Sequence, residues 1–448
     1  MKRSTAPFSL PDADVGWRRS DAGDKEKQAS LAKLGTMSGC HPRRGWYLSM
    51  RSSKASHASL TKFSRWVCFS RPDEGSEAVV KLVSAALIVR NEENYLGACL
   101  ESIAELVDEI VVVDTGSCDR SREIAAAHGA RVVDYEWHDD FAAARNHAID
   151  HATGDWILYI DADERARAYD RRILERELGD PDLCACRVRF YPRTGCTAYP
   201  EHRLFRRDPR IRFRSAIHET IMPDLNRIVA VGGGRIGSSG LTIDHLGYDG
   251  DQSHKAERNL RLLSKQVQVD PDRVYLWWHL GSVYRDLGRL TEAEAAWLRG
   301  AEIARHSSGR GPEIALCLIE LAKLRLLRGE EALALVHEAK ELQPDNLLLR
   351  WIEARVFVAA GRYVEALAIF ERLARLDPDS LLADLSYDRR ILGAWAFAEM
   401  GHCAFRMGRY SESESWYRRA ETLEPDCLEF RIKRQLAGKR AADDLGSQ

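Results

Sequence analysis

The stretch GDWILYIDADE, residues 154–164, joins a strongly apolar run to a pair of acids. Its four consecutive apolar residues, 157–160, are typical of a strand that is buried on both faces of a parallel sheet. Asp161 and Asp163 follow at once, and two such charges repel each other unless one is protonated or a cation lies nearby. Because side chains two apart on an extended backbone point the same way, we expect both acids to face one site.

Three similar β-branched runs precede this one along the chain: VSAALIV (83–89), EIVVVD (109–114) and ARVVDY (130–135). Helix-length segments separate them: NYLGACLESIAELV, CDRSREIAAAHG and DFAAARNHAIDHATG. Strands that alternate with helices predict βαβ units and an α/β domain with a mainly parallel sheet. After about residue 185, basic and apolar residues alternate in the runs CRVRFYP and RIRFRSAIHE, which favours strands with one face in water.

The region from about 255 to 435 repeats a helix, a Gly turn and a second helix. Three of its units close on Pro-Asp, and Pro344 and Pro378 are 34 residues apart, which is the period of the tetratricopeptide repeat. Such units stack into an all-α solenoid with a concave face. The turn-to-turn intervals from Gly288 to Gly329 and from Gly361 to Gly408 exceed this period, so the first and last connections carry insertions.

Composition excludes several classes of protein. The chain has 448 residues, 45% of them apolar. Its 66 basic and 68 acidic residues nearly balance, so the protein has no net positive potential that would attract nucleic acid or an anionic membrane. Its ten cysteines include no CxxC pair, which favours a reducing cytoplasm over a disulfide framework. Neither a transmembrane segment nor a signal peptide is indicated, so we expect a cytoplasmic protein, with peripheral contact to the inner face of the membrane left open.

Polar groups follow three of the four predicted strands. Ligands of open parallel sheets bind outside the carboxyl ends of the strands, where 90–93, 114–117 and 161–163 would converge. A divalent cation is the simplest neutraliser of Asp161 and Asp163, since Mg²⁺ sites commonly combine one or two carboxylates with substrate phosphates. The alternative is that the acids only cap a helix, but their place at the fourth strand end, with Asp114 on the matching edge, favours a nucleotide-sugar site.

The sequence resembles the family 2 glycosyltransferases of the GT-A fold. The residues that carry the resemblance are ALIVRNEENYLGACLESI, VDEIVVVDTGSCDRSREIAAAHGARV and WHDDFAAARNHAIDHATGDWILYIDADE. It is most similar to the bacterial subgroup that joins such a domain to tetratricopeptide repeats and that includes peptide S-glycosyltransferases of the SunS kind. The boundaries that we expect are a disordered extension (1–80), a GT-A domain (81–252), repeats (253–435) and a disordered tail (436–448).

The resemblance implies roles for the matching positions. Asp161 and Asp163 would hold Mn²⁺ or Mg²⁺, His218 would complete the metal shell or contact phosphate, and Asp163 counts as catalytic. Glu219, in FRSAIHET, would be the catalytic base of an inverting transfer, although a His-Glu pair on a strand with no catalytic role fits the spacing as well. The donor-binding residues would be Asn91, Glu93, Asp114, Arg145, Asp161 and Arg203.

Three further residues are weaker candidates. His245, in DHLGY, is a second metal or phosphate contact. Arg203 and Arg206 could neutralise diphosphate, or they could simply lie on a solvated strand.

The expected activity is metal-dependent transfer from a nucleotide sugar, with a UDP-sugar as the expected donor. The acceptor would be a peptide, protein or glycan, which the repeats could present; they could instead form a homodimer. The competing hypotheses are a catalytically inactive repeat adaptor and a nucleotidyltransferase. The nucleotidyltransferase would need a Gly-rich basic loop after the first strand, where the sequence has Arg90-Asn91-Glu92-Glu93.

Overall fold

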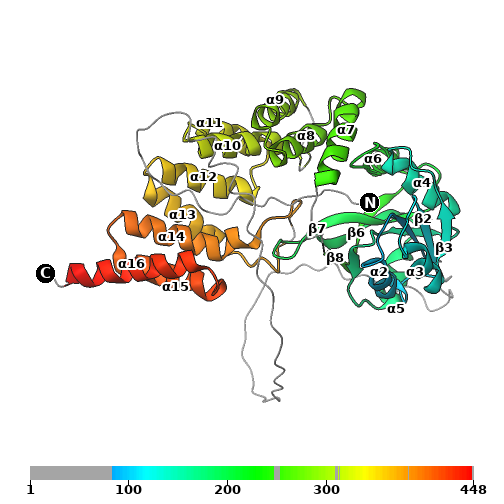
Figure 1. Ribbon diagram of the computed structural model, residues 1–448, viewed down its shortest axis with the longest axis horizontal. Coiled ribbons are helices and arrows are strands. Elements are labelled where there is room, and N and C mark those ends of the chain that lie inside the picture. The colour runs from blue at the N-terminus through cyan, green and yellow to red at the C-terminus, as the bar shows by residue number, and fades with distance from the viewer. Residues whose placement is uncertain (1–82, 247–252, 308–310, 312, 382, 446–448) are drawn as a thin grey trace, which may run out of the picture. The chain divides into compact units, whose positions relative to one another are not determined.

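A mixed eight-stranded sheet occupies the first half of the chain in this computed structural model (Figure 1). The structure describes residues 83–246, 253–307, 311, 313–381 and 383–445. The extension expected over residues 1–80 therefore lies outside the described residues. The fold class is confirmed: an α/β domain comes first and a run of paired helices follows it.

Four parallel strands form one half of the sheet, in the order β3-β2-β1-β4. They are β1 (Val83–Val89), β2 (Glu109–Asp114), β3 (Arg131–Asp134) and β4 (Trp156–Tyr159). Every residue of β1 and β4 is buried. Ala85 and Leu87 pack into the core on one face, whereas Ala86 and Ile88 pack into the core on the other. Burial on both faces is why these strands read as unbroken apolar runs.

The other half continues from β4 in the order β7-β6-β8-β5. Its strands are β5 (Glu164–Ala166), β6 (Leu183–Tyr191), β7 (Tyr199–Arg206) and β8 (Arg235–His245). The β4–β7, β7–β6 and β8–β5 pairs are antiparallel, and β6–β8 is parallel. The short β5 follows the acid pair directly and lies at the end of the sheet.

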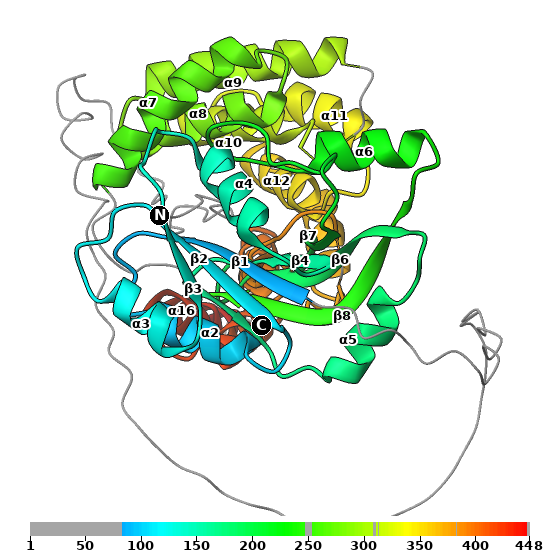
Figure 2. The same cartoon turned by 90° about the vertical axis from the view of Figure 1, so that its right-hand side faces the viewer.

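Helices cover both faces of the sheet, as Figure 2 shows. One face carries α2 (Leu96–Ile103), α3 (Ser121–Ala127) and α5 (Arg171–Leu178), and the other carries α4 (Phe141–His151) and α6 (Met222–Ala230). The predicted strand in RIRFRSAIHE is wrong. Residues 210–219 form an irregular loop with one isolated bridge, Arg214 to Thr220, and with positive φ angles of 76° at Ser215 and 54° at His218.

The repeat region consists of successive helices. They are α7 (Ser253–Val269), α8 (Val274–Asp286), α9 (Leu290–His306), α10 (Leu316–Arg328), α11 (Leu333–Leu342), α12 (Leu347–Ala359), α13 (Tyr363–Leu373), the short η1 (Arg389–Leu392), α14 (Ala394–Arg406), α15 (Tyr410–Leu423) and α16 (Leu428–Leu445). Gly288, Gly329, Gly361 and Gly408 have φ angles of 71–76°, and each ends the first helix of a pair, as the sequence predicts.

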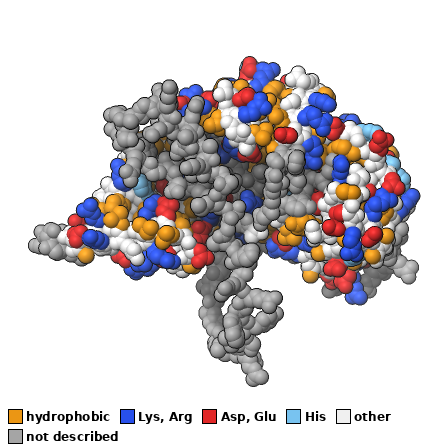
Figure 3. Space-filling view, viewed as in Figure 1, with side chains coloured by type: hydrophobic (Ala, Val, Ile, Leu, Met, Phe, Trp, Pro, Cys, Tyr) orange, Lys and Arg blue, Asp and Glu red, His pale blue; other side chains and the backbone are white. Residues whose placement is uncertain are grey.

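The expected disordered tail is wrong over most of its length, because α16 continues to Leu445. The domain boundary at 252/253 stays a prediction; β8 ends at His245 and α7 begins at Ser253. Among the described residues, no helix combines the length and apolarity that a membrane crossing requires. Basic and acidic side chains intermingle over the part of the surface that is coloured in Figure 3, in keeping with the balanced charge.

Candidate active site

The acid pair lies in a turn. Strand β4 ends at Tyr159, and the amide of Glu164 donates to the carbonyl of Asp161 at 2.9 Å. Oε2 of Glu164 accepts in return from the amide of Asp161, also at 2.9 Å. The extended backbone that we expected from Asp161 to Asp163 is therefore wrong, and each acid is directed to its own partner by the turn.

Arg145 of α4 joins Asp161 to Glu219. Its Nη2 lies 2.6 Å from Oδ1 of Asp161, and its Nε lies 2.7 Å from Oε1 of Glu219. The three side chains are 3%, 8% and 1% exposed, respectively. Because buried charges are tolerated only when they are paired, the two carboxylates, which are far apart in sequence, share one guanidinium as their counter-ion. The contact of Arg145 with a nucleotide stays a prediction.

Asp163 is paired with His245, the last residue of β8. Its Oδ2 lies 2.7 Å from Nε2 of the imidazole, and Nδ1 of His245 lies 2.7 Å from the carbonyl of Pro192. Burial opposes the charge of His245, but the hydrogen bond and the charges of Asp163 and Glu164 outweigh it and raise the imidazole pKa to about 9. Burial, together with the charges of Asp161 and Asp163, raises the pKa of Glu164 to about 7.

Arg203 supplies the third cation of this buried cluster. Its Nη2 lies 2.7 Å from Oε1 of Glu164, and both side chains are 2% exposed. The ring of Tyr159 lies near two guanidiniums, at 4.5 Å from Arg203 and 5.1 Å from Arg145. The donor contact predicted for Arg203 remains untested. Arg206 instead donates to main-chain carbonyls of 180–183 and lies over Trp156, which is a structural role.

The protein's own cations therefore offset much of the acid cluster. The sequence led us to expect a metal diphosphate in that role. The unforeseen partners are Arg145, Arg203 and His245, which arrive from α4, β7 and β8. Any donor must bind beside a charge network that is already paired.

Glu219 ends a loop that the first repeat helices hold. The amide of Ala216 donates to Oε1 of Gln266 on α7 at 3.0 Å. Arg273, just before α8, donates to Oγ of Ser215 and to the carbonyl of His218, both at 3.2 Å. These contacts supply partners for a backbone that no strand pairing satisfies, so the repeats help to fix the predicted base.

His218 occupies a different environment from the one expected for a metal ligand. Its ring stacks on His279 of α8 with centroids 3.6 Å apart, and Tyr275 packs edge-on against it at 5.6 Å. Within the described residues, no three His, Cys, Asp or Glu side chains are grouped as a metal site would require. The metal set of Asp161, Asp163 and His218 stays a prediction.

The predicted nucleotide-contacting residues gather at the carboxyl ends of β1 and β2. Asp114, which is buried, accepts from the amides of Gly116 and Ser117 and forms an ion pair with Arg122 at 3.0 Å. Since β1 lies between β2 and β4, Asp114 is two strand spacings from the end of β4, roughly 10 Å. A nucleoside and its diphosphate could span that interval.

Asn91 and Glu93 tie the first loop to the second. Oδ1 of Asn91 accepts from the amide of Cys118 at 2.8 Å, and Oε2 of Glu93 accepts from the amide of Arg120 at 3.2 Å. Asn91 has a φ of 54°, a left-handed conformation that Asn tolerates better than most residues. Both side chains thus help to shape the edge of the sheet, and their contact with a base stays a prediction.

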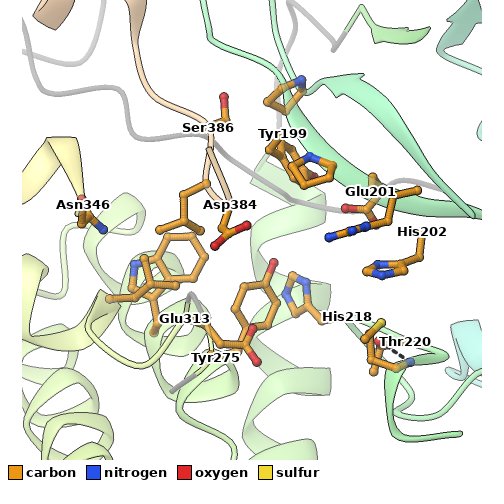
Figure 4. A pocket seen from close by; sticks show the side chains of 18 of the residues that line it. Tyr199, Glu201, His202, His218, Thr220, Tyr275, Glu313, Asn346, Asp384 and Ser386 are labelled. Carbon is orange, nitrogen blue, oxygen red and sulfur yellow. Dashed lines mark hydrogen bonds between the residues drawn. The ribbon is translucent and has the colours of Figure 1, made fainter. Parts of the chain in front are cut away.

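A cavity of about 690 Å³ lies on the other side of Glu219 (Figure 4). His218 and Glu219 line it together with residues of β7, of the repeat helices and of the connections between them. Glu219 therefore borders the cavity while its pair with Arg145 leads to Asp161. The geometry brings Arg145, Asp161 and Glu219 into direct contact, and Asp163 and Arg203 are tied to the same cluster through Glu164 and His245.

Sequence reasoning missed Glu164 and the cavity residues of the repeats. The sequence does contain a signal for Glu164, because it is the third acid within the four residues DADE. The repeat residues had a weaker signal, namely the two insertions in the helical array. Their convergence on one cavity depends on tertiary packing, which no local pattern encodes.

Comparison with known proteins agrees with this architecture. Residues 84–238 match the family model for glycosyl transferase family 2. The chain carries a family 2 glycosyltransferase domain. Tetratricopeptide-repeat models match residues 245–309, 321–380 and 396–427, so this glycosyltransferase domain is followed by repeats.

Several curated proteins are similar to this chain. A TPR repeat-containing protein of Synechococcus elongatus is 38% identical over 229 residues, covering 50% of this chain and 57% of that protein. The prophage-derived glycosyltransferase SunS of Bacillus subtilis is 28% identical over 231 residues, covering 48% and 51%. A lipopolysaccharide core biosynthesis glycosyltransferase of Rhizobium meliloti is 33% identical over 174 residues, covering 35% and 61%. The chain spans about half the length of the curated relatives that it matches.

Solved structures are similar at lower identity. Glucosyl-3-phosphoglycerate synthase from Mycobacterium tuberculosis, in complex with Mn²⁺, uridine diphosphate and glucosyl-3-phosphoglycerate, is 18% identical with a TM-score of 0.31, covering 42% of this chain and 80% of that one. Mannosyl-3-phosphoglycerate synthase from Rubrobacter xylanophilus is 20% identical with a TM-score of 0.33, covering 43% and 75%.

Proposed function

We propose that the chain transfers a sugar from a nucleotide-sugar donor, with a UDP-sugar as the expected donor, to an acceptor bound in the cavity beside Glu219. The observation that carries the proposal is the buried Arg145 pair, which connects Asp161 at the end of β4 to Glu219 at the cavity. Donor and acceptor sites must meet at the reacting carbon, and this pair spans the boundary between them. The family 2 match over residues 84–238 supports the same reaction class.

The donor would lie along the carboxyl edge of β1, β2 and β4. Its nucleoside would approach Asp114 and the loop of Asn91 and Glu93, and its diphosphate would approach Asp161 and Asp163. Support comes from the general rule that open parallel sheets bind ligands at this edge. The strand order brings both groups to one edge of the sheet, roughly 10 Å apart.

A divalent cation, Mn²⁺ or Mg²⁺, is the proposed cofactor, and Asp163 and His245 are its proposed protein ligands. A carboxylate oxygen and an imidazole nitrogen that lie 2.7 Å apart offer the right donor types once metal binding displaces the imidazole proton, with diphosphate and water left to supply the rest. His245 thus replaces His218 in our assignment, because His218 stacks against His279. When bound, such an ion would supply Lewis-acid stabilisation of the leaving diphosphate.

Glu219 is the proposed base of an inverting transfer. The bond from the anomeric carbon to the diphosphate oxygen breaks, and the nucleoside diphosphate leaves with the electron pair. A bond then forms from the acceptor oxygen to the opposite face of that carbon, and the acceptor proton passes to the Glu219 carboxylate. Arg145, whose Nε lies 2.7 Å from Oε1 of Glu219, holds that carboxylate in place.

A donor screen tests the proposal directly. The purified chain would be incubated with UDP- and GDP-sugars and Mn²⁺, and released nucleotide would be followed with and without EDTA. We expect turnover of at least one donor, and loss of that turnover in EDTA. Release of nucleotide from none of them would favour the catalytically inactive adaptor hypothesis instead.

The proposed setting is a reducing cytoplasm. The eight cysteines within the described part of the chain carry free thiols, which suits that compartment. Contact with the membrane surface and a homodimer through the repeats remain open proposals. Sedimentation of the purified chain would decide between monomer and dimer.

A further inference from the structure

The cavity beside Glu219 is built jointly by the sheet and by the two insertions of the repeat array. Glu313 and Gly311 come from the connection between α9 and α10, and Asp384 to Tyr387 come from the connection between α13 and η1. These are the two intervals that exceed the repeat period. Insertions in solenoids map to loops that often form the binding face, and here both reach one cavity.

The second insertion is fastened to the glycosyltransferase domain by two main-chain hydrogen bonds and two that involve side-chain hydroxyl groups. The amide of Thr197 donates to the carbonyl of Tyr387 at 2.7 Å, and the amide of Tyr387 donates to Oγ1 of Thr197 at 2.8 Å. Ser386 donates to the carbonyl of Thr197 at 2.5 Å, and the amide of Arg389 donates to the carbonyl of Gly195 at 2.9 Å. A segment held by four hydrogen bonds to the turn between β6 and β7 is a formed wall of the cavity.

Both aromatic rings and carboxylates line the cavity. Figure 4 shows Tyr275 and Asp384 directed toward the space that Tyr199 and Glu201 border from β7. Trp278 of α8 adds a further apolar surface. Ring faces pack against the C–H face of a sugar, and carboxylates accept hydrogen bonds from its hydroxyl groups.

The lining holds more acidic than basic side chains: Glu201, Glu219, Glu313 and Asp384 against Arg187 and Arg273. Glu219 is paired with Arg145, and Arg273 opposes the burial-driven rise in the pKa of Glu313. A lining with an excess of carboxylates disfavours an anionic ligand, and a volume of about 690 Å³ suits a compact molecule more than an extended chain.

We infer that this cavity binds a neutral saccharide as the acceptor, with one of its hydroxyl groups directed at Glu219. The inference rests on the proposed function, because it names the substrate class of that same site. It also assigns the repeats a direct part in acceptor recognition. The repeats then act as a wall of the active site, and a peptide acceptor becomes the alternative outcome.

Direct binding to the full chain tests the inference. The probes are methyl glycosides of glucose, galactose and N-acetylglucosamine, followed by saturation-transfer NMR, with a Ser- and Cys-containing decapeptide as the competing probe. Tyr275→Ala and Asp384→Asn should raise the Kd of the best glycoside about tenfold, the effect of losing one hydrogen bond to a charged group or one packed ring. Tyr284→Ala, on the same helix, and Asp426→Asn, in the last repeats, lie outside the cavity and should leave that Kd within about twofold of wild type.

Each outcome decides the question. Weaker glycoside binding in the cavity variants alone supports the inference, and Asp384 is exposed, so its variant does not depend on a core substitution. Binding of the peptide but of no glycoside overturns it, as does glycoside binding that both cavity variants leave intact. Donor hydrolysis by the wild-type chain is measured in parallel: hydrolysis without glycoside binding refutes the saccharide site alone, whereas absence of donor turnover refutes the proposed function.

Discussion

Replacing Arg145 with Met removes the cation that two buried carboxylates share. Met keeps most of the apolar length of the side chain, which packs near Tyr159 and Phe213. Asp161 and Glu219 would then repel each other, because the guanidinium that lies 2.6 Å from one carboxylate and 2.7 Å from the other is gone. The folded protein must either keep uncompensated charge or take up protons.

Of these two responses, the one with the lower free-energy cost sets the loss of stability. An ordinary carboxyl titrates about three pH units below neutrality, so protonating it at pH 7 costs about 4 kcal/mol. One protonation suffices, because a protonated carboxyl can donate a hydrogen bond to its charged neighbour. We therefore expect Arg145→Met to lower the free energy of unfolding by about 4 kcal/mol at pH 7, within the range for breaking a buried ion pair. At pH 5 protonation costs only about 1.4 kcal/mol, so most of the loss should disappear.

Urea unfolding of wild type and variant at pH 7 and pH 5 measures this difference. The matched control is Arg362→Met, which removes a half-exposed ion pair to Glu365 and should cost less than about 1 kcal/mol at both pH values. A loss in Arg145→Met that equals the control, or one that does not shrink at pH 5, would refute the reasoning about a shared buried counter-ion.

Three other predictions follow from the repeats. Burial, with the charges of His218 and Arg273, holds the pKa of His279 well below its usual value. The fold therefore keeps its full stability above about pH 6.5 and loses stability as the pH falls below that value, because the unfolded chain takes up a proton that the folded chain does not. His279→Phe should flatten this acid decline in urea unfolding, and an unchanged slope would contradict it. Gly281→Ala would place a methyl group 2.3 Å from the buried ring of Trp297 and should cost about 1–3 kcal/mol by thermal unfolding, whereas a wild-type melting temperature would show that the ring can move. Arg273→Met should lower kcat about tenfold with little change in the donor KM, because it loosens the loop that carries the predicted base; a change confined to the donor KM would argue against this positioning role.

Much of the parallel half of the fold could be predicted from the sequence because its strands are buried on both faces. Such strands read as short β-branched runs, and 83–89 and 109–114 match β1 and β2 residue for residue. The loop 210–219 could not be predicted in this way. Its alternating basic pattern resembles a strand, but two residues with positive φ angles and contacts from Gln266 and Arg273 hold it in an irregular path.

The candidate site was predictable in its residue types and less so in its pairing. The residue pattern predicts Asp161 and Asp163, the family resemblance implies Arg145 and Glu219, and the structure brings Arg145 into contact with Asp161 and Glu219. Which cation meets which acid depends on the packing of α4, β7 and β8 around the turn after β4. His218 shows the limit of sequence reasoning: it neighbours the predicted base, yet the first repeat turns its ring onto His279.

The most direct test of the account is nucleotide release by Asp163→Ala. The central claim is that Asp163, after β4, helps to hold the divalent cation that binds the donor diphosphate, so this variant should lose turnover by a factor of at least about 100, the scale of a lost electrostatic contact to the transition state. Asp244→Ala, which removes a partly exposed pair to Arg167 one residue before His245, is the matched control and should retain wild-type rates. Wild-type nucleotide release by a folded Asp163→Ala variant would contradict the claim.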